Sequence, residues 1–495
     1  MTGTDNCYLK SSLAFPMKAA IRLIGAILGP SPAVNVVAQP SKAGTHVLPI
    51  TLRVKSVHVL GSSRNEPTTQ YVSHKPYSEP QEYGEGPIHE ANEKIVSTYP
   101  IAEGTGTWTE ETKPATFALS SMKVVPHLCR DGGRGGTING THVFVFTDTQ
   151  SFATGSDQMN SFVSSSVATD QGMKALLGEP LVLVDNVGEW QDDVGRMRGF
   201  IPMTSGEEAY NKHLSGSGYR YTVWPESSLI PLNTTHALLY PALIYDVHLS
   251  RQDPVFHEIG NSVALVSVDP TFGPNADRVV KQLYRQDEMT FGTLGGFRAW
   301  GSEGIGGNDG DIYLFGQKRG ENGDGSGGGV RVAKTTPQGF TDLSTYCYWN
   351  GKSWTKTMAQ SDSQGHMLDF PVQDLDVLFV PALGSFVMVY LNSYGDNTFY
   401  YRHLPLDLNA TQADGYGEHI VTGTWSEEKV LVKVDKPAEG FIYAGGIHAG
   451  YFGNDDITTG GWSMLITWTE KTGKPAESPE SGYSHQSAVV KLGIS

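Results

Sequence analysis

The sequence has few cysteines, little charge and no long apolar run, and each shortage excludes a class of protein. Only three cysteines occur, with no Cys-x-x-Cys pair, which argues against a structural zinc site. Whether Cys129 and Cys347 form a disulfide stays open. No run of apolar residues is long enough for a transmembrane helix. Charged residues make up 18%, the net charge is −16 and no basic cluster stands out, so nucleic-acid binding is not expected.

The N-terminal region looks like an export signal. From Met17, the run MKAAIRLIGAILG has a basic start and a short apolar stretch, which predicts secretion. An amphipathic helix or a disordered tail is the alternative. We expect residues 1–50 to form this tail or signal-like segment, and residues 51–495 to form one domain with a polar excursion at 61–118.

Abundant glycine and weak helical periodicity predict an all-β fold. The chain has 58 glycines, and strand-like segments recur along it with turn signals between them. These segments are 52–60, 142–147, 161–169, 180–185, 219–224, 236–249, 261–269, 311–316, 329–334, 377–391, 397–404, 429–434, 441–446 and 462–469. Short helices are expected near 171–178, 205–213 and 274–285. A sandwich, a barrel or a propeller fits such a pattern, and recurring aromatic-plus-glycine hairpins favour the propeller.

One strand ends in an unexpected acid. His142 to Phe146 read as a buried strand, and Asp148 follows between two threonines. A carboxylate that is buried and unpaired costs several kcal/mol, on the order of 2–7 for polar groups and more for charges. Asp148 therefore either caps the turn after the strand or lies at the mouth of a propeller channel.

The segment CRDGGRGGTINGTHVFVFTDT, residues 129–149, resembles the start of a domain-of-unknown-function family of five-bladed β-propellers. Several bacterial members of that family are endo-D-arabinanases, glycoside hydrolases that act on arabinofuranose polymers. The matching residues are Arg130, Asp131, Gly132, Gly133, Asp148 and Thr149. Thr147 replaces the family's usual glycine. The resemblance covers roughly residues 120–470 and implies a five-bladed propeller, with a long N-terminal extension and surface insertions, that hydrolyses a polysaccharide.

Glycoside hydrolysis requires two carboxyl groups on either side of the scissile bond. The resemblance assigns the catalytic pair to Asp131 and Asp148, which a hairpin can bring close together. Asp170 is the third candidate acid, as general acid, pKa modulator or sugar ligand. An equal alternative is that Asp170 is only a turn residue at the end of a strand.

Seven further residues are candidate substrate-binding groups, each with a structural alternative. Glu226 follows Trp224, whose apolar ring favours a raised pKa. Asp246 and His248 share one strand face. The full set is Arg130, Trp224, Glu226, Asp246, His248, Asn261 and His448.

No cofactor is expected to be required. The oxygen-rich segments 308–311, 321–326 and 453–456 lack the EF-hand pattern, so a structural calcium or sodium ion stays open. The expected partner is an oligosaccharide or polysaccharide, without nucleic acid or membrane, bound by a monomer. A non-catalytic lectin-like propeller is the alternative function. A polysaccharide lyase using His248 and Arg251 is a third hypothesis.

Overall fold

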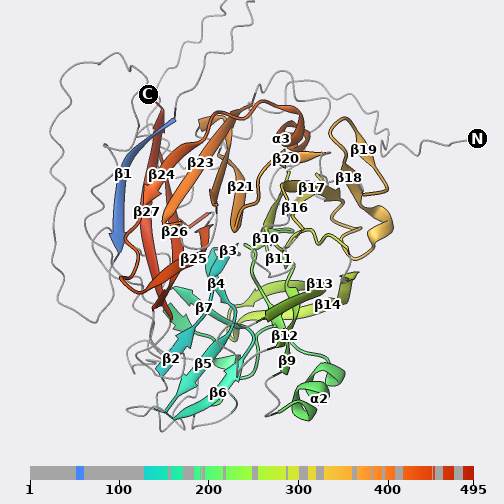
Figure 1. Ribbon diagram of the computed structural model, residues 1–495, viewed down its shortest axis with the longest axis vertical. Helices are drawn as coiled ribbons and strands as arrows, with labels where there is room; N and C mark the ends of the chain where they lie inside the picture. Colours follow the sequence, from blue (N-terminus) through green and yellow to red (C-terminus); the bar gives the residue numbers. More distant parts are fainter. Residues whose placement is uncertain are drawn as a thin grey trace, which may run out of the picture. The chain divides into compact units, whose positions relative to one another are not determined.

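Antiparallel β-sheets make up almost all of the structure (Figure 1). The computed structural model describes residues 52–60, 127–153, 158–170, 183–189, 191, 195–215, 219–247, 255–285, 288–299, 310–318, 328–358, 365–380, 383–392, 396–406, 416–448, 450–451, 461–472 and 483–494. By their contacts, residues 50–495 form one compact unit. The tail expected at 1–50 and the excursion expected at 61–118 lie outside the described residues.

The strand that precedes Asp148 belongs to the first large sheet. Its strands, in sheet order, are β3 (Arg134–Ile138), β4 (Thr141–Phe146), β7 (Ser166–Asp170) and β8 (Leu183–Asp185). Asn139 and Gly140 connect β3 to β4, with φ of 50° and 76°. Two positive φ values in a two-residue hairpin loop favour an Asn-Gly pair. A small sheet beside it contains β2 (His127–Arg130), β5 (Thr149–Phe152) and β6 (Met159–Val163).

The second sheet contains the longest strands of the described chain. Its members are β9 (Tyr219–Trp224), β10 (Ile230–Pro231), β11 (His236–Leu239), β12 (Ala242–Val247), β13 (Val255–Asp269) and β14 (Gly273–Arg285). The helix expected near 274–285 is wrong, because this segment is strand β14. Pro274, Ala276 and Arg278 are buried in alternation with exposed neighbours, which is the period of a strand, and β14 pairs along β13.

The helix expected near 205–213 is confirmed as α2 (Ser205–His213). The Thr204 side chain accepts a hydrogen bond from the Glu207 N–H, and the Glu207 carboxylate accepts one from the Thr204 N–H. This capping box satisfies two of the donors that a helix start leaves unpaired. Arg278 of β14 forms an ion pair with Glu207, so the cap also ties α2 to the second sheet. The helix expected near 171–178 lies outside the described residues.

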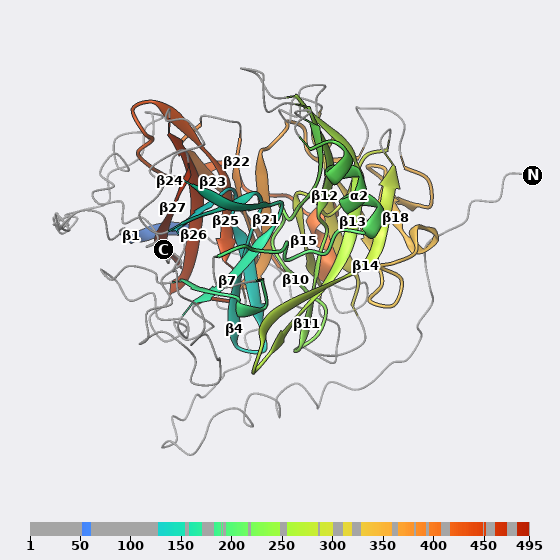
Figure 2. The ribbon, with the colours of Figure 1, turned by 90° about the horizontal axis from the view of Figure 1, so that it is seen from below.

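Three further sheets follow in chain order. The third contains β15 (Gly295–Arg298), β16 (Ile312–Gly316), β17 (Val330–Thr335), β18 (Cys347–Trp349), β19 (Trp354–Thr355) and β20 (His366–Leu368). The fourth sheet contains β21 (Asp374–Val380), β22 (Ser385–Leu391), β23 (Thr398–Pro405) and β24 (Lys429–Lys433). These four strands lie near one another in Figure 2. The short helices η3 (Val187–Glu189), η4 (Leu343–Thr345), η6 (Tyr416–Glu418) and α3 (His419–Thr422) complete the described elements.

The last sheet joins the two ends of the folded unit. Strand β1 (Leu52–Leu60) pairs with β27 (Tyr483–Ile494), which continues through β26 (Gly461–Thr472) to β25 (Gly440–His448). The expected strand at 52–60 is therefore confirmed. Strand β1 therefore completes a sheet that is otherwise made from the C-terminal strands.

One edge strand from each of the five large sheets takes part in a closed cycle of contacts: β3, β10, β15, β21, β25 and β3 again. Glycine allows this close approach. At Gly295, where φ is +135°, a Cβ would lie 2.7 Å from the Leu375 carbonyl oxygen of β21. The cycle brings together five strands that are far apart in the sequence.

A chain of buried hydrogen bonds links the first and last sheets near the start of β4. His142 Nε2 lies 2.8 Å from His448 Nδ1, and the outer ring nitrogens contact Thr137 and Thr467 at 2.9 and 2.7 Å. Burial lowers the pKa of His142 to about 3 and the pKa of His448 well below 6.5. Both rings are therefore neutral in the folded protein.

This pair predicts a pH-dependent contribution to stability. Because the folded pKa of His142 is depressed, the unfolded chain binds more protons between about pH 3 and 6.5, and stability is lost as pH falls through that window. Between pH 6.5 and 5, His142 alone accounts for about 2 kcal/mol of lost stability. Urea unfolding of His142→Asn and wild type at pH 7 and pH 5 tests this. The variant should lose less stability on acidification, and equal losses would contradict the prediction.

Candidate active site

Asp131 and Asp148 lie side by side at the end of β4 where β3 begins. The Asp131 N–H donates to the Asp148 carbonyl oxygen at 2.7 Å, and the Thr147 N–H donates to the Asp131 carbonyl oxygen at 2.7 Å. The Thr147 hydroxyl also donates to that oxygen at 2.6 Å. Gly132 follows with φ of +65°, and a Cβ there would lie 2.9 Å from the same hydroxyl. The Asp-Gly-Gly turn and the Thr-Asp turn are thus fitted to one another.

The Asp131 carboxyl group lies in a half-buried, partly apolar place. The Tyr443 hydroxyl, from β25, donates a hydrogen bond to Asp131 Oδ1. Burial, and secondly the charge of Asp148, raise the pKa of Asp131 to about 7, against the hydrogen bond from Tyr443 and the charges of Lys471 and Arg220. Asp131 is therefore a carboxyl group that holds or releases a proton near neutral pH.

The Asp148 carboxylate has a different environment. Arg220 donates from both terminal nitrogens to its two oxygens, with Nη1 3.0 Å from Oδ1. The Trp224 indole N–H donates to Oδ1 at 2.9 Å. Arg220 and Trp224 are four residues apart in β9, so both side chains extend from the same face of that strand. A forked guanidinium–carboxylate pair fixes the orientation of the carboxylate.

Aromatic rings border the two acids. The Tyr443 ring packs edge-on against Tyr483 of β27, with centroids 6.5 Å apart, and at a tilt against Phe441, with centroids 5.4 Å apart. The charge of Asp131, followed by burial, raises the pKa of Tyr483. On the Asp148 side, the Arg220 guanidinium lies 4.5 Å from the ring centroid of Phe162. Such rings offer faces for stacking as well as apolar surroundings for the carboxyl groups.

Asp170 does not join the pair. In the ladder between β4 and β7, Phe146 lies opposite Ser166 and Val143 opposite Thr169. Asp148 lies beyond the Ser166 end, whereas Asp170 lies beyond Thr169, level with His142. Six positions along a strand correspond to about 20 Å. The expected third catalytic acid is thus at the opposite end of the sheet, where it is buried.

Three of the expected substrate-binding residues are core residues. Arg130 is fully buried, forms an ion pair with Asp185 and stacks 4.6 Å from the centroid of Phe146. Asn261 is fully buried and donates to the Phe291 carbonyl oxygen at 2.9 Å. His448 belongs to the buried histidine pair. All three side chains are buried, so in this structure none is exposed to a substrate.

Glu226 precedes β10 and lies near a second acidic group at the centre of the strand cycle. Burial raises the pKa of Asp374 to about 6; Arg134 opposes the shift, and the charge of Glu226 adds to it. Asp246 lies in β12 opposite Arg220 of β9. His248 lies outside the described residues.

Sequence reasoning missed Arg220 and Tyr443, which hold the two acids. They lie 72 and 312 positions from their partners. No local spacing links residues so far apart, because the contacts arise from the meeting of different sheets. It also missed Arg134, four residues after Arg130 in the same motif. An arginine among four glycines, in GGRGG, is the signal that could have identified it.

The described residues contain no group of three or more His, Cys, Asp or Glu side chains arranged to hold a metal ion. The oxygen-rich segments 321–326 and 453–456, and most of 308–311, lie outside the described residues. Cys129 is buried and keeps its thiol, so it does not form a disulfide with Cys347.

In the described part of the chain, no helix has the length and apolar character needed to cross a membrane.

No protein-family model matches the sequence, and no curated protein matches it. Among solved structures, the chain is similar to one from the GH130 family of mannoside phosphorylases, which contains glycoside hydrolases that target β-1,2-mannosidic linkages in Candida mannan (10% identity, 74% of this chain and 85% of that chain, TM-score 0.33). It is also similar to an α-L-arabinofuranosidase from Podospora anserina in complex with cellotriose (10% identity, 76% of this chain and 93% of that chain, TM-score 0.31). A third similar structure is a GH62 hydrolase in complex with xylotriose (10% identity, 76% of this chain and 94% of that chain, TM-score 0.32). Likeness at scores this low carries no argument about this chain, so its function is argued from the site.

The Tyr443 hydrogen bond predicts a measurable shift at Asp131. Tyr443→Phe removes a donor to the ionised carboxylate, so the pKa of Asp131 should rise above 7, by about one unit. Carboxyl carbon NMR titration follows this pKa, with Asp131→Asn assigning the signal. Tyr400→Phe, on the fourth sheet, is the matched control and should leave the titration unchanged. A pKa that stays at 7 or falls in Tyr443→Phe would refute the assigned contact.

Proposed function

We propose that the protein is a glycoside hydrolase that acts on a furanose-containing, arabinan-like polysaccharide on a five-bladed β-propeller. The closed cycle of five edge strands, together with the completion of the last sheet by β1, supports the propeller. Secretion, expected from the signal-like segment, and a monomeric state belong to the same proposal.

The observation that carries the proposal is the unequal environment of two neighbouring aspartates. Asp131 has a pKa raised to about 7, whereas Asp148 is held by Arg220 and Trp224. Glycoside hydrolases use one carboxyl group that keeps its proton and one that is ionised, on either side of the scissile bond. Two acids whose environments differ in this way take the two different roles.

In the proposed reaction, Asp131 is the general acid and Asp148 the partner carboxylate. Asp131 donates its proton to the glycosidic oxygen as the bond to the anomeric carbon breaks. Asp148 either takes a proton from a water molecule that attacks the anomeric carbon, or attacks that carbon itself to form a glycosyl ester. In the second case water then hydrolyses the ester, and the Asp131 carboxylate takes a proton from that water. Arg220 binds and orients Asp148, and the Tyr443 hydrogen bond stabilises the Asp131 carboxylate after proton transfer. Trp224 and Tyr443 border the position of the sugar.

A non-catalytic lectin-like propeller is the second candidate, and one observation favours it. Both oxygens of Asp148 already accept hydrogen bonds, from Arg220 and Trp224. A carboxylate bound in this way is a poor base unless Arg220 moves when the substrate binds. The lyase hypothesis has no support from the structure, because His248 and Arg251 lie outside the described residues.

The hydrolase proposal predicts distinct effects for the two acids. On a panel of plant, fungal and bacterial polysaccharides, wild type should release reducing sugar, and Asp148→Asn should lower kcat/KM by about 10²–10⁴-fold. Asp131→Asn should lose a similar factor on the polymer. It should lose far less on an aryl glycoside, whose leaving group requires no proton.

Asp170→Asn is the control, because Asp170 lies at the other end of the sheet. It should retain wild-type kcat/KM once thermal unfolding shows that it is folded. Binding of a polysaccharide by wild type without any release of reducing sugar would exclude the hydrolase and favour the lectin.

A further inference from the structure

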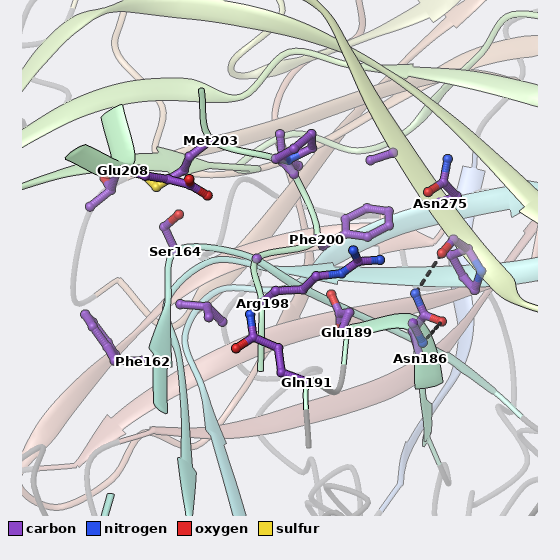
Figure 3. A pocket seen from close by; sticks show the side chains of 18 of the residues that line it. Phe162, Ser164, Asn186, Glu189, Gln191, Arg198, Phe200, Met203, Glu208 and Asn275 are labelled. Atoms are coloured by element: carbon purple, nitrogen blue, oxygen red, sulfur yellow. Dashed lines mark hydrogen bonds between the residues drawn. The ribbon is translucent and has the colours of Figure 1, made fainter. Parts of the chain in front are cut away.

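A cavity of about 630 Å³ lies beside the candidate active site, between the first two large sheets. One wall comes from β6, η3 and the segment that follows η3. The other comes from β9, α2 and the start of β14. Figure 3 shows side chains from both walls, among them Glu189, Arg198, Phe200 and Asn275, extending into one space. The volume falls in the range of small-molecule binding sites.

Two buried polar atoms, one in each wall of the cavity, have no hydrogen-bond partner in the described structure. They are Glu189 Oε1 and Thr222 Oγ1, in side chains that are 2% and 0% exposed. Buried polar groups are paired in most proteins, and an unpaired one costs about 1–3 kcal/mol. Two such atoms in the lining of one cavity indicate that a ligand supplies the missing partners.

The charges of the lining offset one another, because Arg198 and Glu208 have opposite signs and Arg220 is paired with Asp148. The cavity therefore favours a neutral ligand with many hydroxyl groups. Glu189 Oε2 accepts the Val167 N–H at 3.3 Å, burial raises the pKa of Glu189, and its Oε1 is left to pair with a ligand hydroxyl group. Thr222 offers a hydroxyl that both donates and accepts. The amides Asn275 and Gln191 and the rings Phe162 and Phe200 also line the cavity. Amides, hydroxyls and aromatic rings together suit the polar edges and apolar faces of a sugar.

Arg220 and Phe162 connect the cavity to Asp148. Both residues line the cavity, the Arg220 guanidinium lies over the Phe162 ring, and the same guanidinium binds Asp148. A ligand in the cavity is therefore one side chain away from the candidate catalytic pair.

We propose that the cavity between β6, η3, β9 and β14 is a binding site for a neutral sugar unit of a glycan chain, with Glu189 and Thr222 as its buried polar contacts. The assignment of this unit to the substrate chain rests on the proposed hydrolase function. Binding of the sugar in the cavity does not.

Two tryptophan substitutions on β14 test the site. Asn275 and Asp277 are both exposed on the same face of the strand, but only Asn275 lines the cavity. Asn275→Trp should fill the cavity and raise the Kd about tenfold or more, whereas Asp277→Trp should leave the Kd unchanged. Titration calorimetry with arabino-, xylo- and manno-oligosaccharides measures this, in an Asp131→Asn background that prevents consumption of the ligand.

Thr222→Val and Glu189→Gln test the two buried contacts. Each should weaken binding by about two- to tenfold, because each removes or weakens one hydrogen bond. Thermal unfolding identifies a variant that fails to fold, and the exposed tryptophan pair then decides the outcome by itself.

The outcomes for the cavity and for the hydrolase separate. If Asn275→Trp binds as tightly as Asp277→Trp, or if the Asp131→Asn protein binds none of the three oligosaccharide series, the cavity assignment is overturned. Binding that depends on Asn275, without turnover by wild type, supports the proposed sugar site in the cavity and excludes the proposed hydrolase function. Equal turnover by Asn275→Trp and Asp277→Trp supports the proposed hydrolase function and excludes the proposed sugar site in the cavity.

Discussion

The contacts of one buried guanidinium, that of Arg134, hold the centre of the strand cycle together. Arg134 Nη1 donates to the Leu294 carbonyl oxygen at 2.9 Å, and Nη2 donates to the Gly445 carbonyl oxygen at 3.2 Å and pairs with Asp374 at 2.8 Å. One side chain on β3 therefore contacts β21, β25 and the residue before β15. Asp374 in turn accepts the Gly445 N–H at 3.0 Å. Loss of Arg134 would leave buried carboxylates uncompensated, which is strongly destabilising.

The geometry of the candidate site follows from this centre. Asp131 lies three residues before Arg134, and Tyr443 lies two residues before Gly445, so the fixed contact between β3 and β25 also brings the Tyr443 hydroxyl to Asp131. Burial there raises the pKa of Asp131, while β9 supplies the guanidinium that binds Asp148. The same strand lines the neighbouring cavity. Strand order, the unequal acids and the cavity are thus parts of one arrangement.

Local patterns in the sequence predicted the strands well and the long-range contacts poorly. The strand at 219–224 has the expected bounds, because its apolar and β-branched residues lie between turn signals. The segment 274–285 was misread as a helix, since its charged residues concealed a period of two that pairing with β13 imposes. The motif at 129–149 identified Asp131 and Asp148 as neighbours, but Arg130 and His448 proved to be core residues. Burial depends on which sheets meet, and no local pattern contains that information.

A crystal structure of Asp148→Asn soaked with an oligosaccharide that the protein binds would test the central claim most directly. The account predicts a glycosidic linkage between the carboxyl group of Asp131 and the side chain at 148, with Tyr443 and Trp224 on either side and Arg220 displaced or rebound to the sugar. A ligand bound elsewhere, with Arg220 still in contact with residue 148 and no sugar oxygen within hydrogen-bond reach of Asp131, would contradict it.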